Sequence, residues 1–305
     1  MYYTRASLTL LPEGRSLAQN RKKTALVVCG PTAGGKSVLS DALADRLTEA
    51  EGLYVPTLAV DSMQVYRELP VLTNQARRRP AALVGIISVT EEWTVARHKA
   101  LAEEIIASET KFVLDAGTGM YLNAILLDIP LAPKVSTELR RRAEEMAEGE
   151  PNPRRAARAK ELELARAGGR GSIWGGDLLY DTTIVYVRPE RHALDVAIDE
   201  RSKRITMNGL EEAGKLRDMA AAGTRISPQV MDSVGVRELY AHLSGTLPVQ
   251  QAQDLVSTRT RQLARRQIRW FDKLVRTLEG RANISIVEST NQRGVLHNMH
   301  DIIDL

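Results

Sequence analysis

The residues best suited to chemistry lie in a glycine-rich loop near the start of the chain. Residues 30–37 read Gly-Pro-Thr-Ala-Gly-Gly-Lys-Ser, a spacing that binds phosphates when a strand precedes it and a helix follows. Glycines let backbone N–H groups turn toward phosphate oxygens, and the helix N-terminus adds partial positive charge. Lys36 supplies a mobile cation, and Ser37 supplies a hydroxyl that can ligate Mg²⁺. The loop predicts a di- or triphosphate site whose contacts are Gly30, Thr32, Ala33, Gly34, Gly35, Lys36 and Ser37.

Two aspartates follow short apolar runs further along the chain. Asp61 comes after residues 57–60, and Asp115 comes after residues 111–114. A carboxylate at a strand end beside a phosphate site can bind Mg²⁺ or act as a general base. The run that ends at Asp115 also has the form of a Walker B strand, which would bring that carboxylate near a metal. Either aspartate can instead cap a helix or a turn, and the residues alone leave both interpretations open.

Apolar runs that alternate with helical patterns must position these groups. Strands are expected at 25–29, 57–60, 84–89, 111–114 and 182–187, and helices at 37–47 and 94–106. This alternation predicts an α/β fold, namely a P-loop NTPase-like parallel sheet flanked by helices. Ligands bind beyond the carboxyl ends of the strands in such sheets. The glycine loop, Asp61 and the residues after the run at 111–114 should therefore meet in one cleft.

Composition divides the chain into regions. Residues 1–23 are irregular and are expected to form a leader. Residues 133–176 are rich in Ala, Arg and Glu without a strand-like run, which predicts a small helical insertion. The core would then comprise residues 24–132 and 177–305, with a helical C-terminal region after about residue 193.

Basic charge is concentrated near the C-terminal end. Residues 258–276 hold seven Lys or Arg and one acid, a net of +6 within a chain whose formal net charge is +4. Helical spacing puts apolar residues such as Ala264 and Phe271 on one face and most arginines on another. Such a face favours an anionic partner, either nucleic acid or a phosphate ester.

Cysteine count and hydropathy indicate the compartment. The 305 residues include one cysteine, Cys29, so no internal disulfide can form. No apolar run approaches the roughly 20 residues that span a bilayer, and residues 1–23 lack the apolar segment of a secretory signal. We expect a cytoplasmic protein with no membrane association, and we expect a monomer.

Five blocks together resemble a known family. They are residues 30–37, 61–67 (Asp-Ser-Met-Gln-Val-Tyr-Arg), 117–121 (Gly-Thr-Gly-Met-Tyr), 234–237 (Val-Gly-Val-Arg) and 260–267 (Thr-Arg-Gln-Leu-Ala-Arg-Arg-Gln). In this order they resemble the tRNA dimethylallyltransferases and the related adenylate isopentenyltransferases. The resemblance implies that a dimethylallyl group passes from dimethylallyl diphosphate to the N6 amine of an adenine beside the tRNA anticodon, with Mg²⁺ bound by Ser37.

The resemblance also implies roles for individual residues. Asp61 would accept the N6 proton, Thr118 would hold the substrates near the diphosphate, and Arg237 would neutralise the leaving diphosphate alongside Lys36. The residues that it places against the acceptor are Ser62, Gln64, Arg261, Gln262, Arg265 and Arg266. The sequence departs from the family pattern at Asp232, where a basic residue is usual, and at Ala81-Ala82, where two histidines are usual.

Other functions remain open at this point. The same chemistry on AMP, ADP or ATP would need no tRNA contact from the basic helix. A P-loop small-molecule kinase is supported by residues 30–37 and Asp115. A non-enzymatic RNA-binding module is disfavoured by the combination of Lys36, Ser37 and Asp61.

Overall fold

The computed structural model describes residues 22–131, 135–151, 153–165 and 172–288. Their strands form one parallel sheet of order β2-β3-β1-β4-β5. The strands are β1 (Thr24–Cys29), β2 (Thr57–Val60), β3 (Lys111–Ala116), β4 (Asp181–Val187) and β5 (Asn283–Val287). Most of their residues are buried because helices cover both faces, which explains their nearly continuous apolar runs. The α/β fold expected from the sequence is confirmed.

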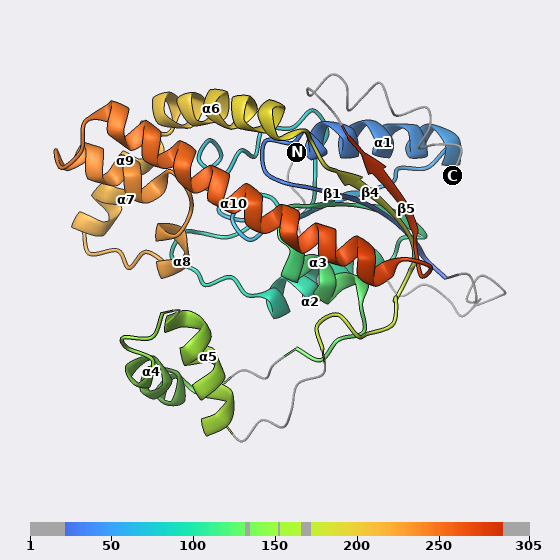
Figure 1. Cartoon of the computed structure of the whole chain (residues 1–305), viewed down its shortest axis with the longest axis horizontal. Coiled ribbons are helices and arrows are strands. Elements are labelled where there is room, and N and C mark those ends of the chain that lie inside the picture. The colour runs from blue at the N-terminus through green and yellow to red at the C-terminus, as the bar shows by residue number, and fades with distance from the viewer. Residues whose placement is uncertain (1–21, 132–134, 152, 166–171, 289–305) are drawn as a thin grey trace, which may run out of the picture.

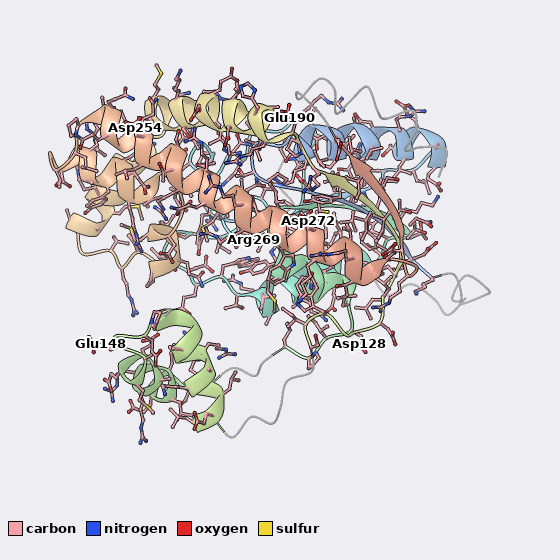
Figure 2. All side chains as sticks on the ribbon, in the orientation of Figure 1. Asp128, Glu148, Glu190, Asp254, Arg269 and Asp272 are labelled. Carbon is pink, nitrogen blue, oxygen red and sulfur yellow. The ribbon has the colours of Figure 1, made fainter. Side chains whose placement is uncertain are left out.

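Helices pack on the two faces of this sheet (Figure 1). One face carries α1 (Lys36–Glu51), whose Leu39 and Leu43 pack against Val28 and Val113. The other face carries α2 (Val95–Ala107), α3 (Gly119–Leu126) and the C-terminal half of α10 (Val249–Leu278). The helix α10 is the basic helix expected from the sequence, and it begins earlier than the basic run itself. Its outward face carries Arg269 (Figure 2).

Between β4 and α10 the chain is helical. It forms α6 (Arg191–Asn208), α7 (Leu210–Ala221), α8 (Pro228–Met231) and α9 (Val236–Leu243). The apolar faces of α7, α9 and the first part of α10 share a second core with Tyr66 and Trp93. This core supports the loops that follow β2. None of the helices in the described part of the chain is long and apolar enough to cross a membrane.

Two helices lie apart from the sheet (Figure 1). They are α4 (Thr137–Met146) and α5 (Pro153–Leu164), and both fall within the insertion expected at residues 133–176. The chain leaves and re-enters the core side by side, since Asp128 N–H donates to Asp177 O at 2.9 Å and Leu179 N–H donates to Leu126 O at 2.9 Å. The division into separate domains stays a prediction.

Two expectations about the elements need correction. Residues 84–89 form no strand but only an isolated bridge from Ile87 to Tyr66, because Leu83 and Gly85 adopt positive φ angles of 66° and 61°. The chain after about residue 193 is not all helical, since β5 follows α10 and extends the sheet. The leader expected at residues 1–23 stays a prediction, because only residues 22 and 23 of it are described, and of these Lys23 contacts α2. Its ammonium donates to the carbonyls of Ile106, Ala107 and Glu109 at the end of α2.

Candidate active site

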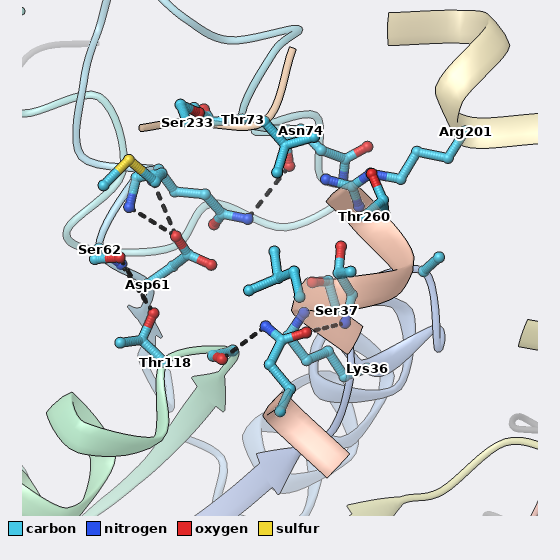
Figure 3. A pocket seen from close by; sticks show the side chains of 18 of the residues that line it. Lys36, Ser37, Asp61, Ser62, Thr73, Asn74, Thr118, Arg201, Ser233 and Thr260 are labelled. Carbon is cyan, nitrogen blue, oxygen red and sulfur yellow. Dashed lines mark hydrogen bonds between the residues drawn. The ribbon is translucent and has the colours of Figure 1, made fainter. Parts of the chain in front are cut away.

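A cavity of about 670 Å³ opens where β1, β2 and β3 end. The glycine loop and the start of α1 form one wall, and the segments after β2 and β3 form another. Helices α6 and α10 and the short stretches 72–76 and 232–234 complete it. Figure 3 shows Lys36, Ser37, Asp61, Ser62 and Thr118 turned toward this space. The convergence that the sequence predicted from strand ends is therefore present.

The glycine loop wraps the N-terminus of α1. Gly35 precedes that helix with φ of 88°, a conformation that favours glycine. A Cβ at Gly30 would lie 2.5 Å from Val187 O, so that glycine permits a close approach of the loop to β4. The fit at Gly34 is less tight, since a Cβ there would lie 3.1 Å from Pro31 O and 3.5 Å from Pro189 Cγ. Gly30 and Gly34 thus shape the loop, whereas the cavity wall is formed by Thr32, Ala33, Gly35, Lys36 and Ser37.

The two oxygens of Asp61 have different surroundings. Oδ1 accepts the N–H groups of Met63 at 2.8 Å and Gln64 at 3.3 Å, which fixes the carboxylate at the start of a turn. Oδ2 points to Gly117, where a Cβ would lie 3.0 Å from Oδ2 and 3.5 Å from Lys36 Nζ. A larger residue at Gly117 would crowd the carboxylate, which would have to shift by a few tenths of an ångström. Oδ1 thus fits the capping interpretation, and the predicted chemical role of Asp61 would fall to Oδ2.

Backbone hydrogen bonds join the ends of β2 and β3. Val60 O accepts the N–H groups of Gly117 at 3.1 Å and Thr118 at 3.0 Å. Thr118 Oγ1 accepts the Ser62 N–H at 3.1 Å, which holds both hydroxyl side chains at the cavity (Figure 3). Gln64 also lines the cavity, so four of the residues predicted after these strands converge there.

Gln267 on α10 ties the two walls together. Its Oε1 accepts the Thr32 N–H at 2.8 Å, and its Nε2 donates to Gly117 O at 2.8 Å. The Gln267 side chain thus fixes the position of the phosphate loop relative to the end of β3. Sequence reasoning assigned Gln267 no role, although it is the last residue of the block 260–267. No local pattern distinguishes a glutamine that bridges two loops from one in solvent.

Arg237 is not at the cavity in this conformation. Its guanidinium donates to Asp232 Oδ1 at 2.6 Å, and its side chain is 56% exposed. Asp232 itself lines the cavity. The departure from the family pattern at Asp232 thus supplies the carboxylate that holds Arg237 outside the wall.

Arg201 on α6 lines the cavity instead. Its guanidinium lies near Asn74 and Thr260 (Figure 3). Burial lowers the pKa of Arg201 to about 10, although the Asp61 carboxylate works against that shift. The group therefore stays protonated near neutral pH. Sequence reasoning missed it because α6 carries several basic residues, and only the fold distinguishes the one that faces the site.

Comparison with known proteins places this site in a family. Residues 64–274 match the family model described as IPP transferase. The chain belongs to the IPP transferase family. A tRNA dimethylallyltransferase from Rubrobacter xylanophilus is 55% identical over 288 residues, which cover 93% of this chain and 99% of that protein. The family expected from the sequence is confirmed.

Solved structures agree with this assignment. The full-length tRNA isopentenylpyrophosphate transferase from Bacillus halodurans superposes with a TM-score of 0.65 at 25% identity, over 93% of this chain and 96% of that one. A eukaryotic dimethylallyltransferase acting on tRNA gives a TM-score of 0.66 at 21% identity, over 87% and 74% of the two chains. The second likeness shows the fold alone.

The basic helix of this IPP transferase family member contributes unevenly to the site. Gln262 and Arg266 line the cavity, and Arg266 is exposed. Arg261 is turned to α6, where Asp199 accepts its Nη2 at 2.6 and 2.7 Å. Arg265 lies beside a separate hollow between α6 and α10. The structure therefore brings only part of the predicted acceptor-binding set to the cavity.

Asp115 does not reach the cavity, because alternation along β3 turns it onto the α1 face of the sheet together with Val113. Arg77 Nη1 donates to Asp115 Oδ2 at 2.7 Å, and Arg77 Nη2 donates to Asp41 Oδ1 at 2.7 Å. Burial would lower the pKa of Arg77, but the two carboxylates outweigh it and raise the pKa. A buried ion cluster thus replaces the metal role considered for Asp115.

This cluster predicts a large stability effect. The side chains of Arg77, Asp41 and Asp115 are 5%, 4% and 2% exposed. Arg77→Met would leave two buried carboxylates without their cation and should lower the free energy of unfolding by about 3–5 kcal/mol. Urea denaturation measures the free energy of unfolding of each variant. Arg78→Ala is the matched control, because that side chain is 67% exposed and its ion pair is worth under about 1 kcal/mol. If the two variants lose the same free energy of unfolding, burial does not make the Arg77 ion pairs more important than the exposed pair of Arg78.

Proposed function

We propose that the protein transfers a dimethylallyl group from dimethylallyl diphosphate to the N6 amine of an adenine in tRNA. The observation that carries this proposal is that Lys36 Nζ and Asp61 Oδ2 both lie against Gly117, 3.5 and 3.0 Å from where its Cβ would be. A phosphate-binding cation and a carboxylate oxygen thus face one small space. The names of the relatives, which specify tRNA, support tRNA over free adenine nucleotides as the acceptor.

The donor diphosphate would occupy the glycine-loop side of the cavity. Backbone N–H groups of the loop and the α1 N-terminus favour an anion there. Lys36 from the loop and Arg201 from α6 add two positive charges to the lining. Their attraction grows as the diphosphate leaves and gains charge, which is electrostatic stabilisation of the transition state.

The residues present also fit a Mg²⁺ ion. Mg²⁺ usually keeps several waters and takes one or two protein oxygens together with substrate phosphate oxygens. Ser37 supplies a hydroxyl at the cavity next to Lys36. No group of three or more His, Cys, Asp or Glu side chains in the described ranges could hold a metal unaided. Ser37 would therefore hold Mg²⁺ jointly with the diphosphate, and the ion would neutralise charge on that leaving group.

The acceptor amine would approach from the Asp61 side. The N6 nitrogen forms a bond to the allylic carbon while the bond from that carbon to the diphosphate oxygen breaks. The N6 proton passes to Asp61 Oδ2, because Oδ1 is already engaged by Met63 and Gln64. Thr118 and Ser62 lie beside this carboxylate and can orient the base and the donor.

The rim of the cavity suits a polyanion. Arg204 and Arg266 are exposed and belong to its lining. Lys and Arg side chains that contact phosphates supply most of the sequence-independent affinity for nucleic acid. The target adenine must leave its stack to reach Asp61, as in other enzymes that modify a base. We further propose that the enzyme acts as a cytoplasmic monomer.

The proposal is tested by label transfer. Dimethylallyl diphosphate labelled in the prenyl group is offered with Mg²⁺ to bulk tRNA and, separately, to AMP and ATP. Label should appear in tRNA and not in the nucleotides. Label in the nucleotides alone would contradict tRNA as the acceptor. Turnover of ATP without label in any acceptor would contradict prenyl transfer and favour a kinase.

A further inference from the structure

Trp270 on α10 is the aromatic residue of the cavity lining within the described residues. It presses its indole edge against Gly119, where a Cβ would lie 2.1 Å from Trp270 Cδ1 and 2.4 Å from Nε1. Gly119 begins α3 directly after Thr118. The ring therefore closes the cavity beside the segment that carries the predicted catalytic threonine.

The indole is held in place by its surroundings. Trp270 Nε1 donates to Asn123 Oδ1 at 3.3 Å, and Asn123 Nδ2 donates to Ile173 O at 3.0 Å. Asn123 is fully buried. The ring of Trp174 packs on that of Trp270 with centroids 4.8 Å apart, and Lys273 Nζ lies 4.5 Å from the Trp174 centroid. A ring packed on several sides cannot easily move aside for a larger ligand, because protein interiors are closely packed.

The position of Trp270 relative to the reacting groups follows from α10. Gln267 lies one helical turn earlier and donates to Gly117 O, and Gly117 is the glycine against which Lys36 Nζ and Asp61 Oδ2 lie. Trp270 extends the same helix face to Gly119. Met120 and Leu263 are further apolar residues of the lining. If the donor diphosphate binds at Lys36 and its allylic carbon reacts near Gly117, then Trp270, Met120 and Leu263 form the apolar wall for its prenyl chain.

We propose that Trp270, braced by Asn123 and Trp174, limits the length of the prenyl chain that the donor site accepts. The substrate class is a short allylic diphosphate, and the inference rests on the proposed function. A five-carbon chain ends against the indole, whereas a longer chain must displace it. The indole is packed against Gly119, Asn123 and Trp174, and forcing a packed side chain out of place costs free energy, which makes the braced ring a steric limit.

The test compares two donors. Wild type and Trp270→Leu are assayed for kcat/KM with dimethylallyl diphosphate and with geranyl diphosphate, at a fixed saturating concentration of tRNA. The ratio of the ten-carbon to the five-carbon donor should rise at least tenfold in Trp270→Leu. Arg269→Leu, an exposed neighbour on the same helix, should leave that ratio unchanged. An unchanged ratio in folded Trp270→Leu would overturn the inference.

A binding measurement keeps the inference testable if Trp270→Leu does not fold. Tryptophan emission of the wild type should change on addition of dimethylallyl diphosphate but not of inorganic diphosphate, and Trp270→Phe should lose that change. A response that persists in Trp270→Phe, or no response in the wild type, would place the chain elsewhere. If neither the wild type nor any variant transfers a prenyl group to tRNA, the proposed function fails. The binding result still decides where the allylic chain lies.

Discussion

Asp61→Asn should lower kcat for prenyl transfer by about 10²–10⁴-fold, the range by which a positioned general base accelerates a reaction. Asparagine keeps an oxygen that can accept the Met63 and Gln64 N–H groups, so the turn should persist. It removes the charge at Oδ2 beside Gly117. Single-turnover transfer to tRNA, with donor and enzyme in excess, isolates this step.

Donor binding separates the base role of Asp61 from a structural one. The dissociation constant for dimethylallyl diphosphate, measured by calorimetry, should change less than about tenfold in Asp61→Asn, since Lys36 and Arg201 remain in the cavity. A collapse of donor binding together with transfer would mean that Asp61 holds a metal or the fold of the loop, and would contradict proton acceptance by Oδ2.

Arg201→Gln should lower kcat/KM for the donor by about 10²–10³-fold, the loss typical when one preorganised donor to a developing anion is removed. The reason is its place in the cavity wall, in a part-buried position where its charge is weakly screened. Glutamine retains some hydrogen-bonding capacity but no charge. Steady-state kinetics with tRNA saturating measure the effect.

Arg237→Gln is the matched comparison, because Arg237 is an exposed arginine paired with Asp232. The decrease in kcat/KM for the donor in Arg237→Gln should stay below about tenfold, because an exposed ion pair contributes little free energy. If Arg237→Gln instead loses as much as Arg201→Gln, the guanidinium of Arg237 must leave Asp232 and enter the cavity with substrate. The role implied by the family resemblance would then hold for Arg237.

Local patterns predicted the elements that depend on local chemistry. The glycine loop, β1, β2 and α2 were predicted because turn glycines, short apolar runs and helical spacing act within a few residues. The strand expected at 84–89 failed because positive φ angles at Leu83 and Gly85 break the run. The strand β5 was missed because two of its five residues are exposed and two more are only partly buried at the sheet edge, which weakens its apolar signal.

The site residues also differ in how far local sequence predicts them. Asp61 and Thr118 follow strands, so the topology of a parallel sheet was enough to bring them together. Arg201 and Gln267 enter from helices distant in sequence, and their direction depends on packing that no short pattern encodes. Asp115 follows the rule for strand ends but faces α1, because one residue of register decides which side of a strand meets the cavity.

An allylic group, not a phosphate, should pass from the donor at the glycine loop to an adenine. The most direct measurement digests tRNA to nucleosides after reaction with dimethylallyl diphosphate and Mg²⁺, and identifies the product by mass spectrometry. We expect adenosine with one five-carbon group on N6, in wild type and not in Asp61→Asn. Unmodified tRNA nucleosides beside a prenylated free nucleotide, or a phosphorylated product from ATP, would contradict prenyl transfer to tRNA.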